Sequence, residues 1–183
     1  FPTRRSSDLT HSGKEYCEET RYLIGADGGF SSLRRQLAPY FIQKMYISIQ
    51  EWFELDFVQP YFSAIFDNQI SDFYSWTIPK DGYLIVGTAI APKNNVNQKF
   101  ELLKGKLSER GFKLGNSCRK HGAFIVRPSS TKQIFLGKGN IAFIGEAAGW
   151  ISPTSAEGLS YAFRSAVALA QSLASGKRSL IDE

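Results

Sequence analysis

The sequence predicts an α/β fold with α+β character, in which a mostly antiparallel sheet is inserted into a smaller strand–helix framework. Two short apolar strands, at 22–24 and 141–144, each end at a glycine that precedes an acidic residue and a helix start. Between them, residues 40–91 are rich in aromatic and β-branched side chains, which favour strands. With 183 residues, 43% of them hydrophobic, the chain can bury a core as one domain or as two small ones.

The amino-terminal part predicts little regular structure before the first of these strands. Residues 1–9 fit no helix or strand period that continues into the following sequence, so we expect a non-native or disordered tail. A turn at 11–14 and strand-forming residues at 15–17 and 21–26 predict a small hairpin or meander. Residues 31–37 predict a helical turn or short helix.

The central part predicts four strands, one helix and a further strand. Their ranges are, in order, strands at 46–55, 61–66, 73–78 and 83–90, a helix at 95–109 and a strand at 123–127. The Asp81-Gly82 pair is a strong hairpin signal. The helix has Phe100, Leu103 and Leu107 on one face and Gly111 as its stop.

The last element is a long helix that we expect to begin near Ser155 and to stop at 175–177. Its apolar residues recur at helical spacing and predict one buried stripe. The stripe comprises Leu159, Ala162, Phe163, Ala166, Val167, Ala170 and Leu173.

Charge and composition argue against several classes of partner. There are 22 Lys and Arg residues against 17 Asp and Glu, a net charge of +5, but no basic run is longer than a pair. Binding to nucleic acid needs a clustered basic face, so we expect no nucleic-acid partner. The charge still suits an anionic cofactor or substrate.

The cysteines and histidines predict no metal site. Cys17 and Cys118 form no CxxC pair, and His11 and His121 have no ligand-like spacing. We expect reduced thiols, although a Cys17–Cys118 disulfide stays open. No apolar stretch approaches a membrane span and no signal peptide is evident, so we expect a cytoplasmic protein, or one bound peripherally to a membrane through a lipid substrate. The sequence does not indicate an oligomeric state.

Two segments combine a strand end, a glycine, an acidic residue and a helix start, the place where α/β folds hold ligands. They are Gly25-Ala26-Asp27-Gly28 with the helix after it, and Gly145-Glu146-Ala147-Ala148 with Pro153 downstream. Neither is specific alone, since a Gly-Ala-Asp-Gly turn is often only a tight β-turn.

Together the segments resemble the flavin hydroxylase superfamily typified by p-hydroxybenzoate hydroxylase. Its Asp-Gly-x-x-Ser-x-x-Arg motif is matched by Asp27, Gly28, Ser31 and Arg34. Its Gly-Asp-Ala-Ala motif with a later proline is matched by Gly145, Ala147, Ala148 and Pro153. Glu146 stands where the family usually has an aspartate that accepts hydrogen bonds from the ribityl hydroxyls of FAD.

A closer resemblance is to the geranylgeranyl reductase family. Its Pro-x-x-x-Glu-Gly motif is matched by Pro153, Glu157 and Gly158, before Leu159. In the family this helix start faces the pyrimidine edge of the flavin; a plain N-cap at Ser155 is the structural alternative.

The same family carries Tyr-x-Trp followed by Pro-Lys, matched by Tyr74, Trp76, Pro79 and Lys80. In the family this aromatic strand lines the substrate cavity. Tyr74 and Trp76 share one face of a strand, where they could equally be core aromatics of the sheet.

The resemblance implies FAD-binding parts at 10–38 and 139–176, a substrate-binding sheet at 39–138 and a truncated end at 177–183. Because the 183 residues contain no Gly-x-Gly-x-x-Gly spacing, we expect the chain as written to bind FAD weakly or not at all.

The implied function is that of a fragment of an FAD-dependent reductase of carbon–carbon double bonds in small apolar, isoprenoid or lipid-like substrates. NAD(P)H or a reduced electron carrier would supply the electrons. Two alternatives stay open: an FAD-dependent monooxygenase of an apolar or aromatic substrate, and a non-catalytic binding module or truncated gene product. No side chain stands out as a general acid, so we assign no catalytic residue.

Overall fold

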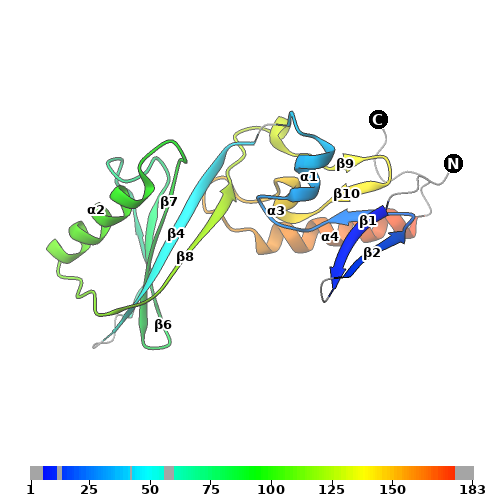
Figure 1. The fold of residues 1–183 in the computed structure, drawn as a ribbon. Coiled ribbons are helices and arrows are strands. Elements are labelled where there is room, and N and C mark those ends of the chain that lie inside the picture. Colours follow the sequence, from blue (N-terminus) through cyan, green and yellow to red (C-terminus); the bar gives the residue numbers. More distant parts are fainter. Residues whose placement is uncertain (1–5, 12–13, 42, 56–59, 176–183) are drawn as a thin grey trace. The chain divides into compact units, whose positions relative to one another are not determined.

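The computed structural model describes residues 6–11, 14–41, 43–55 and 60–175 (Figure 1). The chain divides into two compact units. Unit 2 is the continuous segment Lys44–Arg127, whereas unit 1 combines Phe1–Gln43 with Pro128–Glu183.

Unit 2 is built on a five-stranded sheet whose order is β5-β6-β7-β4-β8. Every neighbouring pair is antiparallel. The strands are β4 (Met45–Glu54), β5 (Ser63–Ile65), β6 (Ser75–Lys80), β7 (Tyr83–Ile90) and β8 (Ser117–Val126). Asp81 and Gly82 join β6 to β7 with φ angles of 51° and 80°, as a two-residue hairpin turn with the strand twist requires.

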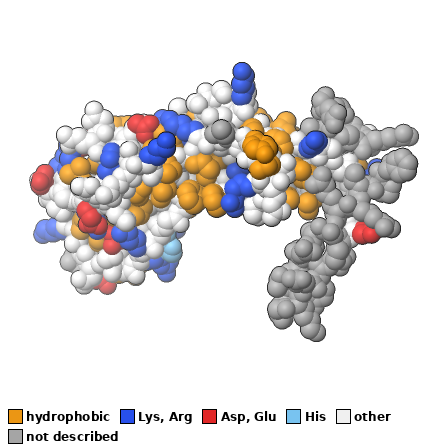
Figure 2. Space-filling view, turned by 45° about the horizontal axis from the view of Figure 1, so that its top comes forward, with side chains coloured by type: hydrophobic (Ala, Val, Ile, Leu, Met, Phe, Trp, Pro, Cys, Tyr) orange, Lys and Arg blue, Asp and Glu red, His pale blue; other side chains and the backbone are white. Residues whose placement is uncertain are grey.

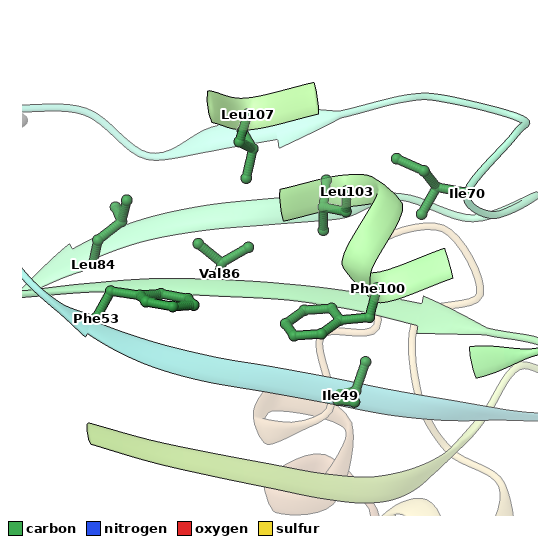
Figure 3. Packing of buried hydrophobic residues seen from close by; sticks show 8 residues of the cluster. All are labelled: Ile49, Phe53, Ile70, Leu84, Val86, Phe100, Leu103 and Leu107. Carbon is green, nitrogen blue, oxygen red and sulfur yellow. The ribbon is translucent and has the colours of Figure 1, made fainter. Parts of the chain in front are cut away.

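Helix α2 (Val96–Glu109) covers one face of this sheet (Figure 1). The Asn95 side chain caps the helix by accepting a hydrogen bond from the Gln98 N–H at 3.4 Å. Phe100, Leu103 and Leu107, the apolar face predicted from the sequence, are all buried. They pack on Ile49, Phe53, Ile70, Leu84 and Val86 to form the core of unit 2 (Figure 3).

Unit 1 contains a three-stranded sheet, ordered β3-β10-β9. The strands β3 (Leu23–Gly25) and β10 (Ile141–Phe143) are parallel, and β9 (Gly137–Lys138) is antiparallel to β10. Its helices are α1 (Ser32–Leu37), the short α3 (Gly145–Ala148), α4 (Leu159–Ala174) and a 3-10 turn at Thr131–Gln133. Ile141, Phe143, Ala147 and Ala148 form its buried cluster.

The amino-terminal region differs from the sequence expectation. Strand β1 (Ser6–His11) pairs with β2 (Lys14–Glu19), so residues 6–9, predicted to lie outside the fold, belong to a ladder. The expected small hairpin or meander is present only in part: β2 pairs antiparallel with β1, whereas β3, the expected last strand, pairs in parallel with β10. Because β10 is so distant from β3 in the chain, their parallel pairing leaves no local signal in the sequence. Residues 1–5 lie outside the described residues.

Helix α4 also differs in its start and in the face it buries. It begins at Leu159 rather than near Ser155. Four residues of the predicted buried stripe are exposed, Leu159, Phe163, Val167 and Ala170. The helix lies against Gly145 with Ala162, which belongs to the predicted stripe, and with Ser165, which does not. Because α4 is apolar or small on nearly every side, hydrophobic periodicity could not select its inner face.

Candidate functional site

The turn after β3 is a tightly hydrogen-bonded start for helix α1. One Asp27 carboxylate oxygen accepts hydrogen bonds from the Ser32 N–H at 2.8 Å and the Leu33 N–H at 3.3 Å. The Ser31 hydroxyl, fully buried, accepts from the Arg34 N–H at 3.0 Å. Gly28 has a φ of 78°, which suits glycine. Asp27 and Ser31 therefore satisfy N–H groups that a helix start leaves unpaired.

Arg34 joins this turn to the second predicted motif. Its side chain is 4% exposed. One guanidinium nitrogen donates a hydrogen bond to the Gly29 carbonyl oxygen at 2.7 Å, and the other donates to the Ala147 carbonyl oxygen. Arg34 and Ala147 are 113 positions apart in the chain, so the two motifs predicted from the sequence meet in space.

The second motif forms the short helix α3, directly after β10. The Gly145 N–H donates to the Ser165 hydroxyl of α4 at 2.9 Å, and a Cβ on Gly145 would lie 3.2 Å from the Ala162 Cβ. Ala147 and Ala148 are buried, while Glu146 is half-buried. Glycine and alanine thus allow α4 to pack closely on this turn.

Gly149, which ends α3, is packed against two residues that lie outside every predicted motif. A Cβ on Gly149 would lie 2.7 Å from Gln43 Nε2 and 2.8 Å from the Gln133 carbonyl oxygen. Gln43 Nε2 also donates to that carbonyl at 3.0 Å. Neither glutamine belongs to a recognisable pattern, so the sequence carried no signal for this contact.

The residues before α4 form a compact turn in which Glu157 caps the helix. The Glu157 carboxylate accepts from the Ser160 N–H at 2.8 Å and from the Ser160 hydroxyl at 2.6 Å. The alternative of a Ser155 cap is wrong, because Glu157 takes this role and Gly158 is the N-cap position. Pro153 is exposed, and Leu159 opens the helix with its side chain in solvent.

Hydrogen bonds in this region lower the pKa values of the Asp27 and Glu157 carboxyls. Burial raises the pKa of the Asp27 carboxyl, but hydrogen bonds from Ser31 and from backbone N–H groups outweigh it and hold the pKa below the usual value. Hydrogen bonds from Ser160 lower the pKa of Glu157. For Arg34, burial lowers the pKa, and the nearby Asp27 and Glu146 carboxylates oppose this effect.

In unit 2, Trp76 lies on the face of the sheet opposite α2. Val86 belongs to the core beneath α2, so the next residue, Gly87, faces the other side. Trp76 is the cross-strand partner of Gly87, and a Cβ on Gly87 would lie 2.3 Å from Trp76 Cε2. The indole therefore packs directly on the Gly87 backbone.

An aromatic row continues from this indole. The Tyr74 and Trp76 ring centroids are 5.7 Å apart, and those of Phe66 and Tyr74 are 6.1 Å apart. Burial raises the pKa of the Tyr74 phenol. Phe66 is 80% exposed, so the row reaches the surface of unit 2. Pro79 and Lys80 lie at the other end of β6, beside the hairpin turn, and Lys80 is exposed.

Two polar residues share the Trp76 face and were not predicted. Gln50 is the cross-strand partner of Gly87, and His121 is the partner of Gln50. Directly opposed residues project to the same side of a sheet, so Trp76, Gly87, Gln50 and His121 form one row across four strands. Strand alternation is readable from sequence, but the register between strands is not.

Solved structures share this fold. A geranylgeranyl bacteriochlorophyll reductase-like protein from Thermoplasma acidophilum has a TM-score of 0.77 at 18% identity, over 95% of this chain and 47% of that one. CmlS, a flavin-dependent halogenase, has a TM-score of 0.58 at 20% identity, over 86% and 31%. The OxyS anhydrotetracycline hydroxylase from Streptomyces rimosus has a TM-score of 0.56 at 20% identity, over 91% of this chain and 34% of that one. The predicted fold class is confirmed.

Curated relatives match in sequence. Protein CbrA of Escherichia coli O9:H4 (strain HS) is 44% identical over 154 residues, which cover 84% of this chain and 42% of the relative. Protein CbrA of Shigella sonnei (strain Ss046) is 44% identical over 146 residues, covering 80% and 41%. The chain thus spans less than half the length of these relatives. No family model matches the chain.

Among the residues with described positions, no three His, Cys, Asp or Glu side chains are grouped so that they could hold a metal ion. Within the same ranges, no helix has both the length and the hydropathy needed to cross a bilayer.

Proposed function

We propose that this chain is part of an FAD-dependent oxidoreductase. The observation that carries the proposal is the Arg34 bridge, which holds the turn after β3 against the turn after β10. These turns follow the carboxyl ends of two adjacent parallel strands, the place where α/β folds bind ligands. The fold shared with a reductase-like protein, a flavin-dependent halogenase and a hydroxylase supports the same assignment.

The residues around these turns have the chemistry that a flavin nucleotide needs. A Cβ added to Gly28 would meet nothing within 4 Å, and one added to Gly158 would meet only Ile151, at 3.8 Å, so a ligand could approach either backbone. The half-buried Glu146 would accept hydrogen bonds from ribityl hydroxyls. Asp27, Ser31 and Glu157 would hold the backbone of the site, since their side chains already pair with helix starts.

For the reaction, we propose reduction of carbon–carbon double bonds in an isoprenoid or other lipid-like substrate. FAD would supply the hydride, with NAD(P)H or a reduced carrier as electron source. Tyr74, Trp76, Pro79 and Lys80 would contact the substrate, with the aromatic rings binding its apolar chain and excluding water. No residue is assigned as a proton donor.

A monooxygenase is the second candidate, because a hydroxylase shares this fold. The two reactions differ in their use of oxygen. With the protein, FAD and a reductant, a reductase should saturate geranylgeraniol under strict anaerobiosis. A hydroxylase should instead consume oxygen in proportion to an added substrate, and it should form no product when oxygen is absent.

The binding claim is tested on the longer protein of which this chain is proposed to be a part, since we expect the chain alone to bind FAD weakly or not at all; FAD is titrated in and quenching of flavin fluorescence is followed. Gly158→Ala adds one methyl group where the structure leaves space, so the fold should survive while FAD binding weakens about tenfold through lost close approach. Gly105→Ala, whose added Cβ would also meet open space, is the matched control in α2. Equal FAD affinity in parent and Gly158→Ala would contradict the assignment of this turn to the flavin.

A further inference from the structure

An open pocket of about 450 Å³ lies within unit 1, between strand β10 and helix α4. Its floor is formed by Ala142 and Phe143 of β10. Ser165, Ala168 and Leu169 of α4 form one wall of the pocket. The volume falls in the range of about 300–1,000 Å³ that small-molecule sites occupy.

The pocket walls are mostly apolar. Leu136 and Trp150 also line the pocket, and Leu136 is 47% exposed. Such walls offer water few hydrogen-bond partners, and apolar cavities of this kind bind apolar ligands in preference to water. An aliphatic chain would therefore be stabilised by the apolar area that it removes from water.

Charge selects the other end of the ligand. Of the residues that the structure describes, Arg164 is the only charged one that lines the pocket, and it is exposed, so a cation lies where the pocket meets solvent. In the same part of the chain no carboxylate lines the pocket, and Arg164 takes part in no ion pair. The charge of Arg164 helps to lower the pKa of Glu157, but that carboxylate is already hydrogen-bonded to Ser160. Figure 2 shows Lys and Arg side chains among exposed hydrophobic ones on the surface of the chain.

We propose that this pocket binds an aliphatic carboxylate, with the hydrocarbon chain against Ala142, Ala168 and Leu169 and the carboxylate paired with the Arg164 guanidinium. A guanidinium matches a carboxylate through two parallel hydrogen bonds. The site between β10 and α4 uses none of the residues assigned to FAD or to the alkene substrate. The proposal is therefore independent of the proposed function.

Dodecanoate is the probe, and its binding to the full chain is measured by isothermal titration calorimetry. Ala168→Met places a larger side chain at the pocket wall, where the hydrocarbon chain is proposed to lie, and should weaken dodecanoate binding more than tenfold. Ala170→Met makes the same change at an exposed α4 position that does not line the pocket, and should leave the affinity unchanged. Equal affinity in Ala168→Met and the parent would overturn the pocket as the site.

A second pair of variants tests the charge. Arg164→Gln and Gln171→Glu each lower the net charge by one on the same helix, but only Arg164 lines the pocket. Arg164→Gln should weaken dodecanoate binding about tenfold and leave dodecan-1-ol binding unchanged, whereas Gln171→Glu should alter neither. If Gln171→Glu weakens dodecanoate binding as much as Arg164→Gln does, the effect comes from the net charge of the protein, and the proposed pairing of Arg164 with the carboxylate is overturned.

Discussion

Single residues decide whether the two strand ends of unit 1 stay together, and Arg34 is the clearest case. A buried guanidinium donates to the backbone carbonyl oxygens of both Gly29 and Ala147. The sequence motif assigned Arg34 to the cofactor. The structure shows that both of its terminal nitrogens already bond backbone, so its part in cofactor binding, which stays a prediction, would be to position the two turns.

Arg34→Ala should therefore lower the free energy of unfolding by about 3 kcal/mol, since it removes the charge-assisted hydrogen bonds that two backbone carbonyl oxygens accept. Arg34→Lys should recover part of the loss, because one ammonium group cannot reproduce the planar fork. The neighbouring Arg35→Ala removes a guanidinium stacked on the exposed Phe30 ring, together with its 3.3 Å hydrogen bond to the Ser31 carbonyl oxygen, and should cost about 1 kcal/mol. Urea unfolding measures all three variants; equal losses for Arg34→Ala and Arg35→Ala would refute the bridge.

At the scale of elements, the close contact between β6 and β7 gives a second prediction. Gly87→Ala should displace the Trp76 indole, since the new Cβ would lie 2.3 Å from that ring, and should cost about 1–3 kcal/mol. Gly122→Ala, in β8 of the same sheet, places its Cβ 3.6 Å from the Ser48 carbonyl oxygen and should be nearly neutral. Thermal unfolding with tryptophan fluorescence distinguishes them, and a neutral Gly87→Ala would show that the indole does not rest on this backbone.

Elements with a local signal were predictable from the sequence, whereas those that depend on distant partners were not. Strand β7 and the α2 apolar face are confirmed as predicted, because turn chemistry and periodicity are properties of neighbouring residues. Strand β8 is longer than the predicted 123–127, since its exposed first residues, from Ser117 onward, carry no alternation and are held by pairing with β4. The row joining Trp76 to Gln50 and His121 depends on register, which no single strand encodes.

At the scale of the whole molecule, unit 2 should fold without the rest of the chain. The segment Lys44–Arg127 is continuous and has its own core, in which Leu103 is 1% exposed. Expressed alone, it should unfold cooperatively in urea, and Leu103→Ala should destabilise it by about 2–5 kcal/mol. The exposed Leu102→Ala, next to it on α2, should cost much less. Absence of a cooperative transition in the isolated segment would show that unit 2 depends on unit 1.

The discontinuity of unit 1 also sets an order of events during synthesis. Strand β3 emerges from the ribosome long before its parallel partner β10, so the pair cannot form until unit 2 has been made. In folded unit 2 the Arg127 N–H donates to the Lys44 carbonyl oxygen at 2.8 Å, so its two ends meet. Closing a flexible loop of about 100 residues costs about 4 kcal/mol of chain entropy. Folding of unit 2 removes most of that cost before β3 and β10 pair. A destabilising substitution confined to the core of unit 2 should therefore slow the assembly of the proposed ligand site, although it changes none of the residues of that site.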